Sequence, residues 1–250
     1  MALARAELES LLRTRRLDRT LTSARPDCHV NDEYAISATG VDALDRCLDG
    51  GFPRGQLSEL AGPRTSGRMS LLLQWLGVAT RRGELVAVID GLDMLDVASL
   101  EAAGVVLDRV LWVRGHVTSN PGFGRELNQR AMEQAIRTMA LILQAGNFGL
   151  VALDVAEAPL EVIRRLPFTT WLRLQRMIEG SQTAALIVGP MPIARSPAGV
   201  TLVLTPGGYR EGRTGAWGTT GTIEGRVIRA RARVAGDTTT TVPTQVHAHV

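Results

Sequence analysis

The chain contains no lysine, so its strongly basic side chains are all arginines. Only two cysteines are present, Cys28 and Cys47, and they lack the CxxC spacing of a metal or redox motif. The four histidines add no ligand pattern, and we therefore expect reduced thiols and no metal site. No stretch of about 20 apolar residues occurs, and the arginine-rich N-terminus lacks the apolar segment of a secretory signal. We expect a cytoplasmic protein that does not contact membranes.

The overall charge of the chain is close to neutral. With 28 basic and 25 acidic side chains, the formal net charge is +3 and the sequence pI is about 9.5. This balance is compatible with an anionic partner such as nucleic acid, but it identifies none because no localised basic patch stands out. At 250 residues and 45% hydrophobic content, the chain is long enough for one domain with short appendages.

The hydrophobic pattern divides the chain into three segments. The first predicts an amphipathic helix, because Leu8, Leu11 and Leu12 form an apolar stripe opposite charged residues. This helix either docks on a neighbouring chain, as a partner-binding or oligomerisation element, or packs on its own domain. The last segment is rich in threonine, and we expect it to be flexible. The three segments are the N-terminal helix at 1–25, a core domain at 26–235 and the flexible tail at 236–250.

Predicted strands alternate with predicted helices through the core segment. The stretches Leu85–Asp90 and Gly149–Asp154 are almost wholly apolar up to their last residue, which is typical of strands buried on both faces of a parallel sheet. We therefore predict an α/β fold with a mostly parallel sheet flanked by helices. The predicted elements are helix Val41–Leu48, strand Gln56–Leu60, helix Met69–Ala79, strand Leu85–Asp90, helix Val97–Ala103, strand Arg109–Val113, helix Leu127–Ala145, strand Gly149–Asp154, helical segments between Leu160 and Glu179, strand Ala184–Val188, and edge or antiparallel strands at Val200–Leu204 and Val227–Val234.

A glycine-rich phosphate loop lies between the first long strand and the helix that follows it. The loop keeps both glycines of the motif GxxxxGK[ST], and these allow backbone N–H groups and a helix N-terminus to face phosphates. Arg68 and Met69 replace the lysine that contacts the β- and γ-phosphates and the hydroxyl that binds Mg²⁺. A guanidinium is wider than an ammonium, and a thioether is a poor ligand for Mg²⁺. The candidate phosphate-binding residues are Gly62, Ser66, Gly67, Arg68, Met69 and Ser70, the last as a hydroxyl shifted by one position.

Asp154 ends one of the apolar strands. In nucleotide hydrolases, an acidic residue at the carboxyl end of a core strand lies beside the phosphate loop. Asp154 is therefore a candidate for the second half of a nucleotide site. The alternative is an ordinary aspartate that caps the loop after its strand.

Several segments upstream and downstream of the loop fit one known pattern. They are Ser37–Asp45, Gly50–Gly55, Gly62–Gly67 and Val88–Asp90. With them, the chain resembles the RecA recombinase family from Ile36 to about Ala235. The resemblance implies that Asp96 keeps a position that contacts adenine. It also implies that Leu92 replaces the catalytic glutamate, that Ser99 replaces an aromatic residue that stacks on the base, and that Gly189 and Pro190 replace a polar pair containing the glutamine that senses the γ-phosphate.

These departures, together with Arg68 and Met69, affect separate parts of the nucleotide site. Each catalytic group of this kind contributes orders of magnitude to a rate, so their joint loss predicts hydrolysis near background. We predict a pseudo-ATPase with a degraded phosphate loop, which is not an enzyme and needs no cofactor, although weak ATP binding is compatible with the remaining glycines.

Arginines provide candidate contacts with other macromolecules. Arg229, Arg231 and Arg233 alternate along one predicted strand and so share a face. By the resemblance, Arg231 and Arg233 match the basic pair with which one RecA subunit reaches its neighbour's nucleotide, which implies a protein interface and a homo-oligomer. The alternative is a charged edge strand that discourages aggregation. The candidate DNA contacts, each of which could equally be a solvated charge, are Arg164, Arg165 and Arg195.

A short RecA-like core, an altered phosphate loop, a leading amphipathic helix and a shortened DNA-binding loop after Gly189 together resemble the ImuA family. That resemblance implies an accessory role in the bacterial DNA damage (SOS) response, in which the protein acts with ImuB and an error-prone replicative-type polymerase in translesion synthesis and mutagenesis. It also implies contact with RecA and its filaments. Two alternatives remain: a SulA-type cell-division inhibitor that binds the tubulin-like division protein, and a weakly active DNA-dependent ATPase related to recombinases.

Overall fold

The computed structural model describes residues 36–115, 125–194, 199–209, 220–229 and 238–245. The predicted N-terminal helix lies outside these ranges. The candidate site residues of the sequence analysis that lie outside the described ranges are Leu8, Leu11, Leu12, Arg195, Arg231 and Arg233.

The described residues form one eight-stranded sheet in the order β10-β9-β8-β3-β7-β6-β4-β5, together with a separate pair of short strands, β1 and β2. The elements in chain order are β1 (Ile36–Ser37), α3 (Asp42–Cys47), β2 (Phe52–Pro53), β3 (Leu57–Ala61), α4 (Arg68–Arg81), β4 (Val86–Asp90), α5 (Val97–Ala102), the 3₁₀ helix η1 (Leu107–Arg109), β5 (Val110–Arg114), α6 (Arg125–Ala145), β6 (Leu150–Asp154), α7 (Leu160–Arg164), α8 (Phe168–Ile178), β7 (Ala184–Gly189), β8 (Thr201–Tyr209), β9 (Thr220–Arg229) and β10 (Thr238–Gln245).

Six neighbouring strands, from β8 to β5 in the sheet order, run parallel to one another. At the β8 edge, β9 pairs antiparallel with β8, and β10 pairs antiparallel with β9. The predicted α/β class with a mostly parallel sheet is therefore confirmed. The carboxyl ends of the parallel strands lie at one edge, so the loops that follow β3, β4, β6 and β7 come together there.

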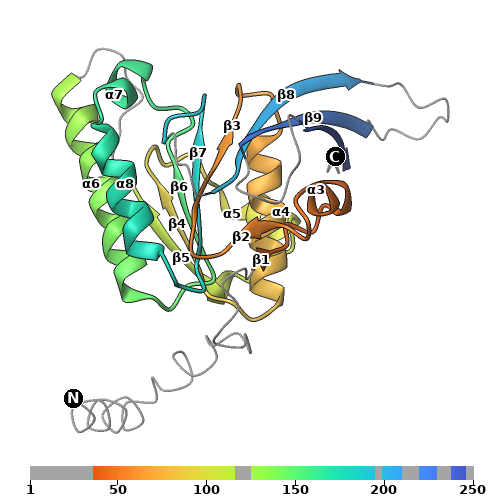
Figure 1. Ribbon diagram of the computed structural model, residues 1–250, viewed down its shortest axis with the longest axis horizontal. Helices are drawn as coiled ribbons and strands as arrows, with labels where there is room; N and C mark the ends of the chain where they lie inside the picture. The colour runs from red at the N-terminus through yellow and green to blue at the C-terminus, as the bar shows by residue number, and fades with distance from the viewer. Residues whose placement is uncertain (1–35, 116–124, 195–198, 210–219, 230–237, 246–250) are drawn as a thin grey trace, which may run out of the picture.

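Helices cover both faces of the sheet, with α3, α4 and α5 on one side and α6, α7 and α8 on the other (Figure 1). In β4, Val86 and Val88 pack on the α4 side, whereas Ala87 and Ile89 pack on the α6 side. Successive strand side chains point to opposite faces, so a strand covered on both faces is apolar at every position. No helix within the described residues combines the length and apolar content needed to cross a bilayer.

The antiparallel edge differs most from the sequence prediction. β8 continues to Tyr209, beyond the predicted end at Leu204, and β9 spans Thr220–Arg229 where Val227–Val234 was predicted. Pairing between β8 and β9 sets these limits, and a pairing register is not visible in local hydrophobicity.

The third antiparallel strand, β10, occupies residues 238–245, where the sequence analysis expected part of a flexible tail. The four threonines that begin this strand are β-branched, and such residues favour extended backbone once a partner strand is available. The prediction treated a threonine-rich composition as disorder and missed this preference.

A buried ion pair lies at the amino edge of the parallel strands. Arg54, which follows β2, donates to Oε1 of Glu84 at 2.8 Å, and only 4% and 3% of these two side chains are exposed. Arg82 donates to the same carboxylate oxygen at 2.9 Å. The remaining Arg54 donors bind the backbone carbonyl oxygens of Ile36 at 3.1 Å, Gly149 at 3.0 Å and Gln182 at 2.9 Å. The pair therefore joins the segment before β3 to the starts of β4, β6 and β7.

Candidate nucleotide site

The phosphate loop joins β3 to α4 at the carboxyl edge of the sheet. Gly67, the residue before α4, has a φ of +80°, a left-handed conformation that glycine adopts at little cost. A Cβ on Gly62 would lie 2.5 Å from the carbonyl oxygen of Leu204 and 2.6 Å from Oγ of Ser66. Both glycines of the motif are thus required by the path of the backbone.

Arg68 is the first residue of α4, and it is buried with only 4% of its surface exposed. Its guanidinium donates to the carbonyl oxygen of Gly62 within the loop and forms an ion pair with the carboxylate of Glu157. It also approaches the carbonyl oxygen of Ala156 at 3.4 Å. The guanidinium therefore bridges the phosphate loop and the loop between β6 and α7.

The position of the expected Mg²⁺-binding hydroxyl is held by Met69, and the two serines nearby are placed differently from each other. Met69 is partly buried and packs against the hydrophobic core on the α4 side of the sheet. Ser70, the next residue, is exposed on α4. Ser66 is fully buried, and its Oγ has no hydrogen-bond partner among the described residues. A buried hydroxyl without a partner costs free energy, so the loop retains one unmet polar contact.

Asp154 ends β6 directly beside Asp90 at the end of β4, because the two residues are partners in the strand register. Burial raises the pKa of Asp154 to about 6, and the negative charge of Asp90 acts in the same direction. The N–H of Ala156 donates to Oδ1 of Asp154 at 2.9 Å and, with the charge of Arg68, limits the rise. Asp154 thus has the capping contact that the sequence analysis offered as an alternative, and it also lies within the electrostatic influence of Arg68.

Asp90 is completely buried, and its carboxylate serves the loop that follows β4. It accepts hydrogen bonds from the N–H groups of Met94 at 3.0 Å and Leu95 at 2.9 Å, and from Nε1 of Trp112 at 3.3 Å. Leu92, in the same loop, is 8% exposed and packs in the core on the α6 side. The position that the resemblance assigns to a catalytic glutamate therefore contributes an apolar core contact.

Asp93, next to Leu92, has a φ of +55°. Its carboxylate forms two hydrogen bonds with Arg114, from Nε at 2.6 Å and from Nη2 at 2.7 Å. The Arg114 guanidinium carbon lies 5.0 Å from the ring centre of Trp112, which is within cation–π range. The Asp93 carboxylate is thus engaged at the sheet edge formed by β5.

Asp96 is the N-cap of α5. Its Oδ1 accepts a hydrogen bond from the N–H of Ser99 at 2.8 Å, and hydrogen bonding from Ser99 holds the pKa of Asp96 below its usual value. Both residues that the resemblance associates with adenine are therefore used in a helix cap. At the end of β7, the Gly189 carbonyl oxygen accepts a hydrogen bond from the Gly62 N–H at 3.2 Å, which links this strand end to the phosphate loop.

The structure brings part of the predicted site together. Gly62, Ser66, Gly67 and Arg68 share the loop and the first turn of α4, and Asp154 interacts with Arg68. Arg164 and Arg165 are exposed at the end of α7, and Arg229 ends β9, where it pairs in register with Thr201 of β8. Their roles in DNA or protein binding stay predictions.

The sequence analysis did not identify Glu157 or Arg114, nor the contacts by which Asp90 and Asp93 hold the site together. The one available signal for Glu157 was its acidic side chain in the loop that follows Asp154. No motif connects Glu157 to Arg68, because the two residues lie far apart in the sequence and meet only through the parallel strand order.

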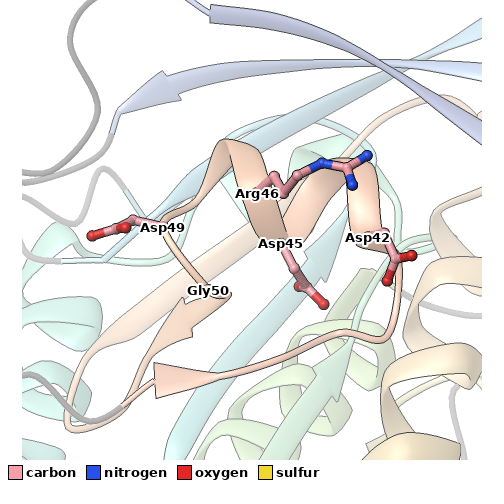
Figure 2. Close-up of a pocket in the computed structure, with 5 residues that line it drawn as sticks. All are labelled: Asp42, Asp45, Arg46, Asp49 and Gly50. Atoms are coloured by element: carbon pink, nitrogen blue, oxygen red, sulfur yellow. The ribbon is translucent and has the colours of Figure 1, made fainter.

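A pocket also lies beside α3 (Figure 2). Its lining residues are Asp42, Asp45, Arg46, Asp49 and Gly50. The Asp45 carboxylate is already used, because it accepts hydrogen bonds from the N–H groups of Thr39 at 2.8 Å and Gly40 at 2.9 Å. This acidic pocket contains none of the residues of the phosphate loop.

A parallel sheet whose first core strand leads through a glycine loop into a helix, with an acidic residue at the carboxyl end of the next strand but one, defines the class of P-loop nucleotide-binding folds. Comparison with known families places the chain within this class. The family model of the RecA N-terminal domain matches residues 27–161, which is more than half of the chain. The protein therefore belongs to the RecA N-terminal domain family.

Individual relatives agree with this assignment. Protein RecA of Desulforapulum autotrophicum is 35% identical over 124 residues, which are 49% of this chain and 32% of that protein. Protein RecA of Desulfovibrio desulfuricans is 33% identical over 133 residues, or 53% of this chain and 33% of that protein. Protein RecA of Clavibacter michiganensis subsp. michiganensis is 34% identical over 125 residues, or 50% of this chain and 31% of that protein. The matched part thus spans about a third of the length of these relatives.

Proposed function

We propose that this protein is a non-catalytic, RecA-like accessory protein of the bacterial DNA damage (SOS) response. The observation that carries the proposal is the position of Arg68, whose guanidinium is bonded within the phosphate loop and to Glu157. A side chain held in this way is not arranged to stabilise a transferring phosphoryl group, which requires cations aimed at the phosphate oxygens.

Other contacts of the site support the same proposal. A magnesium nucleotide needs a hydroxyl at the start of α4, where Met69 instead packs in the core. Leu92 packs in the opposite core, and the neighbouring Asp93 is bonded to Arg114. Asp96 caps α5 through Ser99. The residues present therefore fit a magnesium nucleotide poorly.

The protein is therefore proposed to act by binding other proteins rather than by hydrolysing a nucleotide. By its resemblance to the ImuA family, we expect binding to ImuB and to RecA, and through them an indirect link to an error-prone replicative-type polymerase in translesion synthesis. We expect the N-terminal stripe formed by Leu8, Leu11 and Leu12 to serve as the docking element.

Measurement of ATP turnover tests the catalytic part of the proposal. We expect purified protein to hydrolyse ATP no faster than a protein-free control, with or without single-stranded DNA, and we expect Arg68→Ala to give the same result. DNA-stimulated turnover that disappears in Arg68→Ala would contradict the proposal and would favour the reading of the chain as a weakly active ATPase.

Affinity capture of the full chain from DNA-damaged cells tests the partners. We expect recovery of ImuB and RecA, and loss of both from a variant in which Leu8, Leu11 and Leu12 are changed to serine. A circular dichroism spectrum would check that this variant keeps its folded core. Recovery of the tubulin-like division protein without ImuB or RecA would instead identify a SulA-type inhibitor.

A further inference from the structure

The phosphate loop is in contact with a cation that belongs to the protein itself. The Arg68 guanidinium donates to the Gly62 carbonyl oxygen at the start of the loop, and Arg68 is 4% exposed. A bound phosphate would attract this same guanidinium, because Arg68 stands at the position that normally contacts the β- and γ-phosphates. Binding of a polyphosphate therefore has to compete with the existing contacts of Arg68.

Glu157 is the charged member of those contacts. It lies in the loop between β6 and α7, and 33% of its side chain is exposed, compared with 4% for Arg68. The ion pair therefore has one end inside the protein and the other at its surface. A carboxylate in this place also repels an approaching phosphate, because both groups are negatively charged.

We propose that the ion pair of Arg68 and Glu157 closes the phosphate loop against polyphosphates. This inference goes beyond the absence of hydrolysis, because it concerns whether the loop is open to an anion at all. It identifies Glu157, which belongs to no recognised phosphate-binding motif, as the residue that controls access.

A second observation shows that the loop has kept capacity for a ligand. Ser66 is fully buried, and its hydroxyl has no partner among the described residues. Gly67 still takes the left-handed conformation that begins α4, a helix of 14 residues whose N-terminus favours anions. Loss of the Glu157 charge would release the guanidinium toward an anion that also reaches these groups.

Calorimetric titration of the full chain with sodium triphosphate in EDTA tests the inference without adenine, magnesium or turnover. We expect Glu157→Gln to bind triphosphate about tenfold more tightly than the unchanged protein, or about 1.4 kcal/mol. The matched control is Glu179→Gln. It removes the same charge from an exposed glutamate after α8, and we expect no change in affinity. Glu157→Ala should reproduce the gain.

Equal affinity of the unchanged protein and both Glu157 variants would overturn the inference, and so would the absence of measurable binding in all of them. An equal gain in Glu179→Gln would also overturn it, because net charge alone would then explain the effect. Thermal unfolding of each variant checks that the protein is folded. These outcomes are independent of ATP turnover and of the captured partners, so the inference can fail while the proposed function stands.

Discussion

Two buried arginines, one at the amino ends and one at the carboxyl ends of the parallel strands, form similar sets of hydrogen bonds and ion pairs. Arg54 at the amino edge and Arg68 at the carboxyl edge each donate to backbone carbonyl oxygens and to one glutamate, and each is 6% exposed or less. They differ in the glutamate. Glu84, the partner of Arg54, has 3% of its side chain exposed, whereas Glu157, the partner of Arg68, has 33% exposed.

This difference separates a structural ion pair from one that can open. Removing one partner of a fully buried pair leaves a charge that water cannot reach, and this strongly destabilises a protein. When one partner is partly exposed, water can solvate it after the pair separates, and the cost is smaller. We therefore expect the Arg54 pair to maintain the fold and the Arg68 pair to control a site.

The largest expected effect is that of Arg54→Met. It leaves the buried Glu84 carboxylate with only Arg82 as a charged partner and removes the hydrogen bonds that Arg54 donates to three backbone carbonyl oxygens. We expect the free energy of unfolding to fall by about 3–5 kcal/mol, measured by urea denaturation at pH 7. Arg173→Met, at an exposed arginine on α8, is the control and should change little. If Arg54→Met lowers the free energy of unfolding by less than about 1 kcal/mol, the Arg54 pair does not maintain the fold and the contrast with the Arg68 pair is wrong.

The next effect concerns the pH dependence at the carboxyl edge. Burial raises the pKa of Asp154 from 3.8 to about 6. The folded state therefore binds the Asp154 proton more tightly than the unfolded state does. Protonation of Asp154 stabilises the folded state below about pH 4, and this stabilisation is lost as the pH rises through about 6. Asp154→Asn cannot ionise, so it does not lose stability as the pH rises, and it keeps an oxygen acceptor for the Ala156 N–H.

Urea denaturation at two pH values measures this effect. We expect the stability of Asp154→Asn, relative to the unchanged protein, to be greater at pH 8 than at pH 4 by about 2–3 kcal/mol. The same relative stability at both pH values would show that Asp154 titrates normally in the folded protein.

Arg68→Met should have a smaller effect on stability than Arg54→Met, although it is the same substitution at an equally buried arginine. Glu157 becomes solvated when its partner is lost, so the main cost is that of the missing hydrogen bonds, about 1–2 kcal/mol. The measurement is urea denaturation under identical conditions. Equal losses in the two variants would remove the distinction between the two ends of the sheet.

The smallest effect is expected for Arg82→Gln. Arg82 shares Glu84 with Arg54, but 35% of its side chain is exposed, so the contact is screened by water. We expect a loss below about 1 kcal/mol in the same denaturation experiment. A loss as large as that of Arg54→Met would mean that the two arginines neutralise Glu84 equally.

Much of the fold could be predicted from the sequence because it rests on local signals. Continuous apolar strands such as Val86–Asp90 and Leu150–Asp154 indicated a sheet covered on both faces, and the structure confirms it. The β9 and β10 strands were misplaced or missed, because their limits depend on pairing between strands rather than on composition.

The candidate site was predictable in its motif and not in its contacts. The spacing of Gly62 and Gly67 identified the phosphate loop, and the structure explains both glycines through a close backbone approach and a positive φ. The engagement of Arg68 by Glu157 could not be predicted, because it depends on how the loops after β3 and β6 face each other.

By itself the sequence determined the class of fold and the chemical groups available at the phosphate loop, since strand patterns and motif spacing are properties of neighbouring residues. Only the tertiary structure decided that the pair of Arg54 and Glu84 is buried at both ends and that the pair of Arg68 and Glu157 reaches the surface. The physical reason is that the solvation of an ion pair depends on the chain segments packed around it, and these segments are distant in the sequence.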